Sequence, residues 1–116
     1  MRVKLKNEAA ASVSQSGPEA LRPGRAYTVQ EISTMAERAS YFRIEVVRHE
    51  PPALFDVRLF EVVTPLIPSN WAASLTAEGL LTIGPLAWRV PEFWNAFLDR
   101  QDWAVEAYEK ERDREL

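Results

Sequence analysis

Alternation of hydrophobic and polar residues predicts that much of the chain consists of short β-strands. Residues 1–6 place Val3 and Leu5 between charged residues, the period of two that is typical of a strand with one buried face. We predict an edge strand here, because lysines on an edge discourage pairing with other chains. Residues 7–20 are rich in alanine and serine and contain a Gly-Pro pair, so we expect a long loop there. The length of this loop also leaves open a short helix over Glu8 to Val13.

Two further strands are predicted before the double proline at 51–52. Residues 26–32 follow a Pro-Gly turn and alternate until Glu31, where we expect a bulge or the end of the strand. The polar residues 33–40 are predicted to connect this strand to residues 41–48, which show the clearest alternation in the chain. The side chains predicted to point inward from the second strand are Phe42, Ile44 and Val46.

Turn chemistry divides the middle of the chain into two pairs of strands. The hydrophobic residues after the double proline fall on both parities, which one straight strand with a single buried face cannot accommodate. We therefore predict a strand at 53–55, a tight turn at 56–58 and another strand at 59–63. Residues 69–83 are predicted to form a hairpin in which Gly79 adopts a positive φ angle.

Two helices are predicted to follow. Pro91 suits a first helical position, and the aromatic residues after it recur at helical spacing. A second helix is predicted from about Asp102 to Arg114, with Trp103 and Tyr108 on its apolar face. The apolar stripe stops after Tyr108, so we expect the helix to fray there or to meet a partner. The fold class predicted from these elements is α+β: a small β-barrel or strongly bent antiparallel sheet, an added hairpin and two C-terminal helices.

Composition restricts the classes of function. The chain has 116 residues, 47% of them hydrophobic and 27% charged, which fits a single globular domain. It has no cysteine, so disulfides and thiol chemistry are excluded, and we expect a cytoplasmic protein. No apolar stretch is long enough to span a bilayer, so no membrane partner is expected. The net charge of −3 makes nucleic acid a poor candidate partner.

Candidate catalytic chemistry is sparse. His49, the only histidine, lies beside the double proline and is interpreted as an exposed turn residue, because any nucleophile or metal site would have to be completed by carboxylates alone. Glu45, Asp56 and Glu61 lie on neighbouring predicted strands, but Glu45 alternates outward and is expected to pair with an arginine in solvent. No glycine-rich phosphate loop is present. We expect a protein that is not an enzyme and has no cofactor and no metal.

Four tryptophans within residues 71–116 are the most unusual feature of the composition. Such large rings dominate the energetics of cores and interfaces. Helical spacing favours a core position for Trp94 and Trp103. Trp71 and Trp88 flank turns, so core packing and partner contact are equally consistent with their positions, and both are candidate interface residues.

Negative charge is concentrated in the last part of the chain. Residues 91–116 contain eight acidic and four basic residues, a net charge of −4. A helix with mixed charges on a solvated face is one interpretation. The other is an acidic surface that docks onto a basic cleft, such as the active site of a nuclease toxin. The candidate residues for such a surface are Glu106, Glu109 and Asp113.

Several segments resemble a group of small bacterial proteins whose first half is an SH3-like barrel. They are LRPGRAYTV (21–29), SYFRIEV (40–46), PALFDVRLFEVV (52–63), IPSNW (67–71), LTIGP (81–85) and PEFWNAFLD (91–99). The resemblance implies a single domain with an SH3-like core at 1–66, a hairpin extension at 67–90 and C-terminal helices at 91–116. Members of this group include immunity proteins found beside secreted toxins and phage-related proteins. The resemblance assigns no functional residue.

Three hypotheses follow from the sequence. The first is a non-enzymatic protein-binding module, an immunity protein that blocks a cognate bacterial toxin. The alternative is a nucleic-acid-binding SH3-like barrel, phage-related in origin, with a basic patch near the start of the chain. The third, an enzyme, would need a pocket that gathers His49 with carboxylates. Self-association through the apolar helical face is left open. The basic patch would consist of Arg2, Lys4, Lys6, Arg22 and Arg25.

Overall fold

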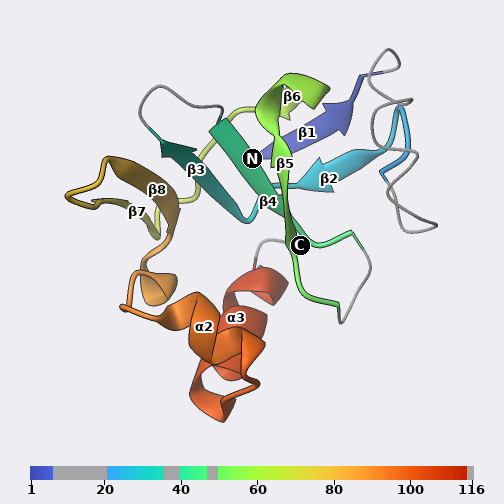
Figure 1. The fold of residues 1–116 in the computed structure, drawn as a ribbon. Helices are drawn as coiled ribbons and strands as arrows, with labels where there is room; N and C mark the ends of the chain where they lie inside the picture. Colours follow the sequence, from blue (N-terminus) through green and yellow to red (C-terminus); the bar gives the residue numbers. More distant parts are fainter. Residues whose placement is uncertain (7–20, 36–39, 47–49, 115–116) are drawn as a thin grey trace.

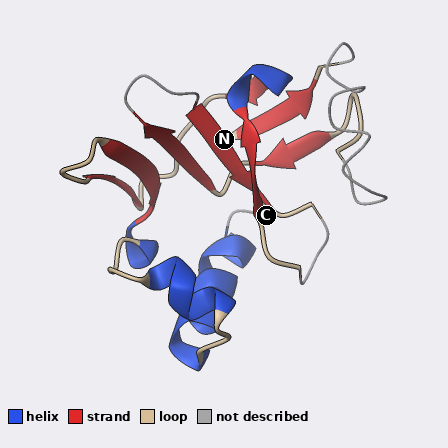
Figure 2. Ribbon diagram, in the orientation of Figure 1, coloured by secondary structure: helices blue, strands red, loops and turns tan. Residues whose placement is uncertain are grey.

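Two antiparallel sheets and a pair of C-terminal helices make up the part of the chain described by the computed structural model, which is residues 1–6, 21–35, 40–46 and 50–114. The helices lie together at one end of the molecule and the strands form the rest, which we call the body (Figures 1 and 2). The predicted α+β class, with antiparallel strands, an added hairpin and two C-terminal helices, is confirmed. The expectations for the loop at 7–20 and for His49 lie outside the described residues.

The first sheet has three strands, with β1 (Arg2–Leu5) between β2 (Ala26–Thr28) and β6 (Phe60–Thr64). The prediction that β1 is an edge strand is therefore wrong. Lys4, one of the lysines on which that prediction rested, lies opposite Glu61 on β6, and the two side chains form an ion pair at 3.1 Å. A charged strand face can thus be neutralised across a ladder as well as by solvent.

The second sheet has five strands in the order β5-β4-β3-β8-β7. Its strands are β3 (Glu31–Met35), β4 (Ser40–Ile44), β5 (Ala53–Asp56), β7 (Trp71–Leu75) and β8 (Leu80–Pro85). The predicted strand at 26–32 is two strands, because the chain leaves the first sheet after Thr28 and enters the second at Glu31. The predicted connection at 33–40 is corrected, since residues 33–35 belong to β3. Within the described residues the two sheets do not join into one closed barrel.

Both turn-linked pairs in the middle of the chain are confirmed. The 3-10 turn η3 (Val57–Leu59) separates β5 from β6, and the Asp56 carboxylate starts it by accepting a hydrogen bond from the Arg58 amide at 2.8 Å. The hairpin of β7 and β8 turns at Gly79, whose φ of +91° has the predicted sign. Because β8 also pairs with β3, the hairpin extends the sheet of the body.

The helical end begins with a second 3-10 turn, η4 (Leu86–Trp88), followed by α2 (Phe93–Leu98) and α3 (Asp102–Arg114). The helix α2 starts two residues after Pro91, because Glu92 adopts a left-handed conformation with φ of +66°. The helix α3 matches its predicted bounds. The expected fraying after Tyr108 is wrong, because Glu111 and Arg112 are buried and the helix continues to Arg114.

Two separate apolar clusters stabilise these parts. Within the body, strand residues form a cluster that we call the body core. Around η4, α2 and α3, aromatic residues form a second cluster, which we call the helical core. The body core is Val3, Leu5, Leu21, Tyr27, Val29, Phe42, Ile44 and Phe60. The helical core is Trp88, Phe93, Ala96, Phe97, Ala104 and Tyr108.

Candidate functional site

The outer side of α3 carries a row of four carboxylates. Glu106, Glu109 and Asp113 follow Asp102 by four, seven and eleven residues, a spacing that brings all four to one side of a helix with 3.6 residues per turn. Glu109 is half-buried and the other three are exposed. We call these four residues the acidic face. It contains all three acidic residues predicted for a partner surface.

The opposite side of α3 is fixed to the body by Tyr108, whose side chain is 2% exposed. The Tyr108 hydroxyl donates to Glu45 Oε2 at 2.7 Å and accepts from Gln30 Nε2 at 2.9 Å. Burial, together with the hydrogen bond to the Glu45 carboxylate, raises the pKa of Tyr108 well above the usual range of a phenol. The phenol is thus a neutral donor that holds the helix against the ends of two body segments.

Arg112 is a buried residue of α3 that contacts two members of the acidic face, Glu109 and Asp113. Its buried guanidinium lies 3.5 Å from Glu45 Oε2, 3.1 Å from Asp113 Oδ1 and 3.6 Å from Glu109 Oε2. Burial lowers the pKa of Arg112, but the carboxylates of Asp113 and Glu45 outweigh burial and raise it. Arg112 therefore compensates part of the charge of Glu109 and Asp113. Among the described residues, Asp102 and Glu106 form no ion pair.

A third contact completes the attachment of α3. Asn70 Nδ2, just before β7, donates to Glu111 Oε2 at 2.6 Å, and Glu111 is 5% exposed. Sequence reasoning missed Glu111 and Arg112 as anchors, because charged residues at the end of a helix normally face solvent. Their spacing from Ala104 and Tyr108, at i+7 and i+8 from Ala104, is the signal that could have identified them.

One exposed apolar side chain borders the acidic face. Trp103, on α3 itself, is 45% exposed. Trp103 lies three residues before Glu106 and so covers the neighbouring strip of α3. The prediction that Trp103 is a core residue is wrong: its ring contacts Phe93 only at the margin of the helical core, with centroids 6.1 Å apart. Trp94 does pack against the helical core, as predicted.

The two tryptophans proposed as interface residues have different environments. Trp88 is 2% exposed, stacks on Phe93 and Tyr108, and donates from Nε1 to the Ala107 carbonyl at 3.1 Å. Its expected contact with a partner is therefore corrected, because the ring is enclosed by the helical core. Trp71 is half-buried at the start of β7 and packs against the body core. A role for Trp71 in binding stays a prediction.

A buried charged cluster joins the helical end to the body. Glu31, 1% exposed, accepts from Arg43 Nε at 3.1 Å and forms an ion pair with Arg89. The Arg43 guanidinium also lies over the Trp94 ring, 3.9 Å from its centroid, in a cation–π contact. Burial lowers the pKa of Arg43, and Glu31 opposes that shift. Gly84 permits this approach, since a Cβ there would lie 3.0 Å from Glu31 Cγ.

The candidate catalytic carboxylates are not brought together. Each forms its own ion pair: Glu45 with Arg112, Asp56 with Arg58 at 2.7 Å, and Glu61 with Lys4. Glu45 does pair with an arginine as predicted, but in a buried contact instead of a solvated one. Hydrogen bonds from Arg58 lower the pKa of Asp56 to about 2. Among the described residues, no cluster of three or more His, Asp or Glu side chains could hold a metal ion.

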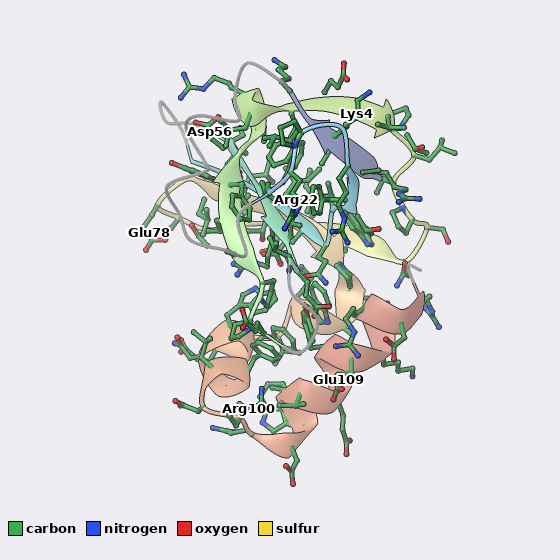
Figure 3. The ribbon with its side chains drawn as sticks, turned by 90° about the vertical axis from the view of Figure 1, so that its right-hand side faces the viewer. Lys4, Arg22, Asp56, Glu78, Arg100 and Glu109 are labelled. Carbon is green, nitrogen blue, oxygen red and sulfur yellow. The ribbon has the colours of Figure 1, made fainter. Side chains whose placement is uncertain are left out.

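The residues of the predicted basic patch lie on or beside the β1–β2 ladder, in which Arg2 is opposite Thr28 and Lys4 is opposite Ala26. Lys4 is paired with Glu61, and Arg22 is exposed (Figure 3). Arg2 and Arg25 instead line a cavity beside β2, together with Arg112 of α3. Lys4 is thus neutralised by Glu61, whereas Arg2 and Arg25 face a concave surface.

Comparisons with known proteins leave the family open. No family model, no curated protein and no solved structure matches the chain. None of the helices in the described ranges has both the length and the apolar character needed to cross a bilayer.

Proposed function

We propose that this protein is a non-enzymatic protein-binding module, and specifically an immunity protein that binds and blocks a bacterial toxin in the cytoplasm. The observation that carries the proposal is the acidic face of α3, a row of four carboxylates of which three are exposed, on a helix whose other side is anchored to the body. A rigid acidic helix complements the basic cleft of an enzyme that handles nucleic acid, and opposite charges speed the encounter of the two proteins.

The apolar residue beside the acidic face, Trp103, supports the same proposal. Interfaces gain most of their affinity from a few large side chains, and tryptophan is the commonest of them. Trp103 is exposed next to Glu106, and its Nε1 is already satisfied by Gln101 Oε1 at 2.9 Å. The ring can therefore be buried by a partner without leaving a polar group unpaired.

We further propose that the body is an SH3-like fold whose two sheets are the halves of an open barrel. The pairings support this: β1 pairs with β2 and β6, and β3 with β4, which in turn pairs with β5. Only Val29 and Gln30 lie between β2 and β3, so these two strands act as one bent strand that belongs to both sheets. A single 3-10 turn, η3, then leads from β5 to β6. An experimental structure with a different strand order would contradict this assignment.

The proposal predicts that a neighbouring gene encodes a toxin, and the experiment that tests it is co-expression and purification with that gene product. We expect the wild-type protein to rescue growth and to form a stable complex. Glu106→Lys and Trp103→Ala, singly, should weaken the complex by roughly tenfold or more, measured by calorimetry at fixed salt. Both side chains are exposed, so the free protein should keep its fold.

Glu78→Lys is the matched control for Glu106→Lys. It reverses the same charge at an exposed position, but in the turn between β7 and β8 and not on α3 (Figure 3). Its affinity should stay within about twofold of the wild type. Equal weakening by Glu78→Lys and Glu106→Lys would mean that net charge, and not the acidic face, governs binding. Absence of rescue and of a complex would refute the assignment as an immunity protein.

A further inference from the structure

A cavity of about 220 Å³ lies beside β2, between the body and α3. Its volume equals that of roughly seven water molecules at about 30 Å³ each, enough for a small ligand group. Arg2 comes from β1, Arg25 from the residue before β2, and Arg112 from α3, so three arginines from separate segments line the same cavity. The cavity is separate from the acidic face, although Arg112 contacts both.

The charges that line this cavity do not balance. Arg112 is paired with Glu45, which also lines the cavity. Arg2 and Arg25 have no carboxylate partner among the described residues. Counting only partners within the described ranges, the lining therefore carries two uncompensated positive charges.

Two features restrict the positions of these side chains at the cavity. Arg2 lies directly opposite Thr28 in the β1–β2 ladder, so the Arg2 side chain and the Thr28 hydroxyl leave the sheet on the same side. The Arg25 guanidinium lies over the Tyr27 ring, 5.6 Å from its centroid, and this contact favours one position for a long side chain. Guanidinium groups bind planar or tetrahedral oxyanions through paired N–H donors.

We propose that this cavity binds a phosphoryl group through Arg2 and Arg25, with Thr28 as an additional donor. Charge selects the ligand, because a phosphate monoester carries about −1.5 to −2 at pH 7, which matches the two free guanidiniums, whereas one carboxylate matches only half of them. The site goes beyond the proposed toxin binding and does not depend on it, since it requires the free protein alone.

The test is a titration of the free protein with inorganic phosphate at pH 7, followed by amide and arginine Nε signals in NMR. Sodium chloride of equal ionic strength is the reference, because exposed charges respond to screening alone. We expect saturable shifts confined to the Arg2, Arg25 and Thr28 region. Arg25→Gln and Arg2→Gln should each raise the dissociation constant by roughly tenfold, the effect of losing a charged hydrogen bond.

Arg22→Gln is the matched control, since it removes an equal charge from an exposed arginine that does not line the cavity (Figure 3). It should change the dissociation constant by less than about twofold. Shifts that do not saturate, that chloride reproduces, or that Arg22→Gln abolishes equally would overturn the proposal. An aspartate-rich peptide that competes as well as phosphate would also overturn it, because a phosphoryl group would then have no preference.

A second arm identifies the source of the phosphoryl group. A single-stranded 20-nucleotide DNA is titrated against the wild type and the Arg25→Gln variant. Tighter binding than inorganic phosphate, with the same dependence on Arg25, supports the site and assigns it to a polynucleotide backbone. Saturable phosphate binding without DNA binding supports the site and assigns it to a small phosphorylated ligand.

Discussion

At the scale of single residues, the Tyr108 hydroxyl is one of the points at which the helical end is fixed to the body. One oxygen donates to Glu45 and accepts from Gln30, so the contact is complete only when the phenol is protonated. The ring of the same residue belongs to the helical core, and its centroid lies 5.3 Å from the centroid of the Trp88 ring. Tyr108 therefore couples a polar contact to an apolar one.

Tyr108 should make the protein sensitive to alkali. Its pKa is raised in the folded protein, so the unfolded chain loses the phenolic proton first, near the ordinary value of 10.0. The contribution to stability is complete below pH 10 and decreases above it by about 1.4 kcal/mol per pH unit, until the folded pKa is reached. Urea unfolding between pH 9 and pH 11.5 measures this slope.

Tyr108→Phe is the control for this effect. The variant lacks the titrating group, so its stability should decrease with a smaller slope above pH 10, whatever its stability at pH 7. Identical slopes for the two proteins would show that the phenol is not held protonated by the fold.

The sequence identifies the large aromatic and charged side chains, but it predicts only in part which of them are buried. Trp88 and Trp103 are chemically identical, yet one is 2% and the other 45% exposed. The difference arises because η4 turns Trp88 beneath α3, where it meets Phe93 and Tyr108. Nothing in the local pattern around either residue determines that distant contact. Glu31 was likewise expected only to mark a bulge or the end of a strand, and its burial depends on arginines 12 and 58 positions away.

At the scale of elements, local chemistry was the reliable guide. The pair β5 and β6 was predicted from a parity change, the hairpin from Gly79, and α3 from its first residue Asp102. These signals act between residues close in sequence. The position of β1 in the middle of its sheet was missed, because strand neighbours are set by pairing with β2 and β6, far along the chain.

The last turn of α3 should be more protected than its sequence suggests. Arg112 links this turn to Glu45 on the body, so the amides of residues 110–114 should exchange slowly with solvent. Arg112→Ala should accelerate their exchange on the order of tenfold, because the anchor and its three carboxylate contacts are lost. Native-state hydrogen exchange measured by NMR or mass spectrometry gives the rates.

Arg114→Ala serves as the control on the same helical turn. Arg114 is exposed and contacts Glu111 only at 3.9 Å, so exchange should change little. If both variants accelerate exchange equally, the turn is held by its own backbone and not by the contact with the body.

At the scale of the whole molecule, two apolar clusters are joined mainly by polar and charged contacts. The body core and the helical core share no residue. Between them lie the Glu31 cluster, the Tyr108 and Arg112 contacts with Glu45, and the Asn70 contact with Glu111. Buried charged contacts of this kind add little net stability, but removing one partner leaves a buried charge uncompensated. The body and the helical end should therefore unfold together only while these contacts are intact.

Glu31→Gln should separate the unfolding of the two parts. The variant leaves Arg43 and Arg89 buried beside each other without a carboxylate, at a cost of about 3–5 kcal/mol. Trp88, Trp94 and Trp103 all lie at the helical end, so tryptophan fluorescence reports mainly on that part, whereas circular dichroism in the strand region reports on the body. In the wild type both signals should change together in urea, as in a two-state transition. In Glu31→Gln the fluorescence transition should occur at a lower urea concentration than the circular dichroism transition.

Glu61→Gln is the control. It removes a carboxylate from the exposed pair with Lys4 and should leave the two transitions coincident. Coincident transitions in Glu31→Gln would mean that contacts other than the charged cluster join the helices to the body.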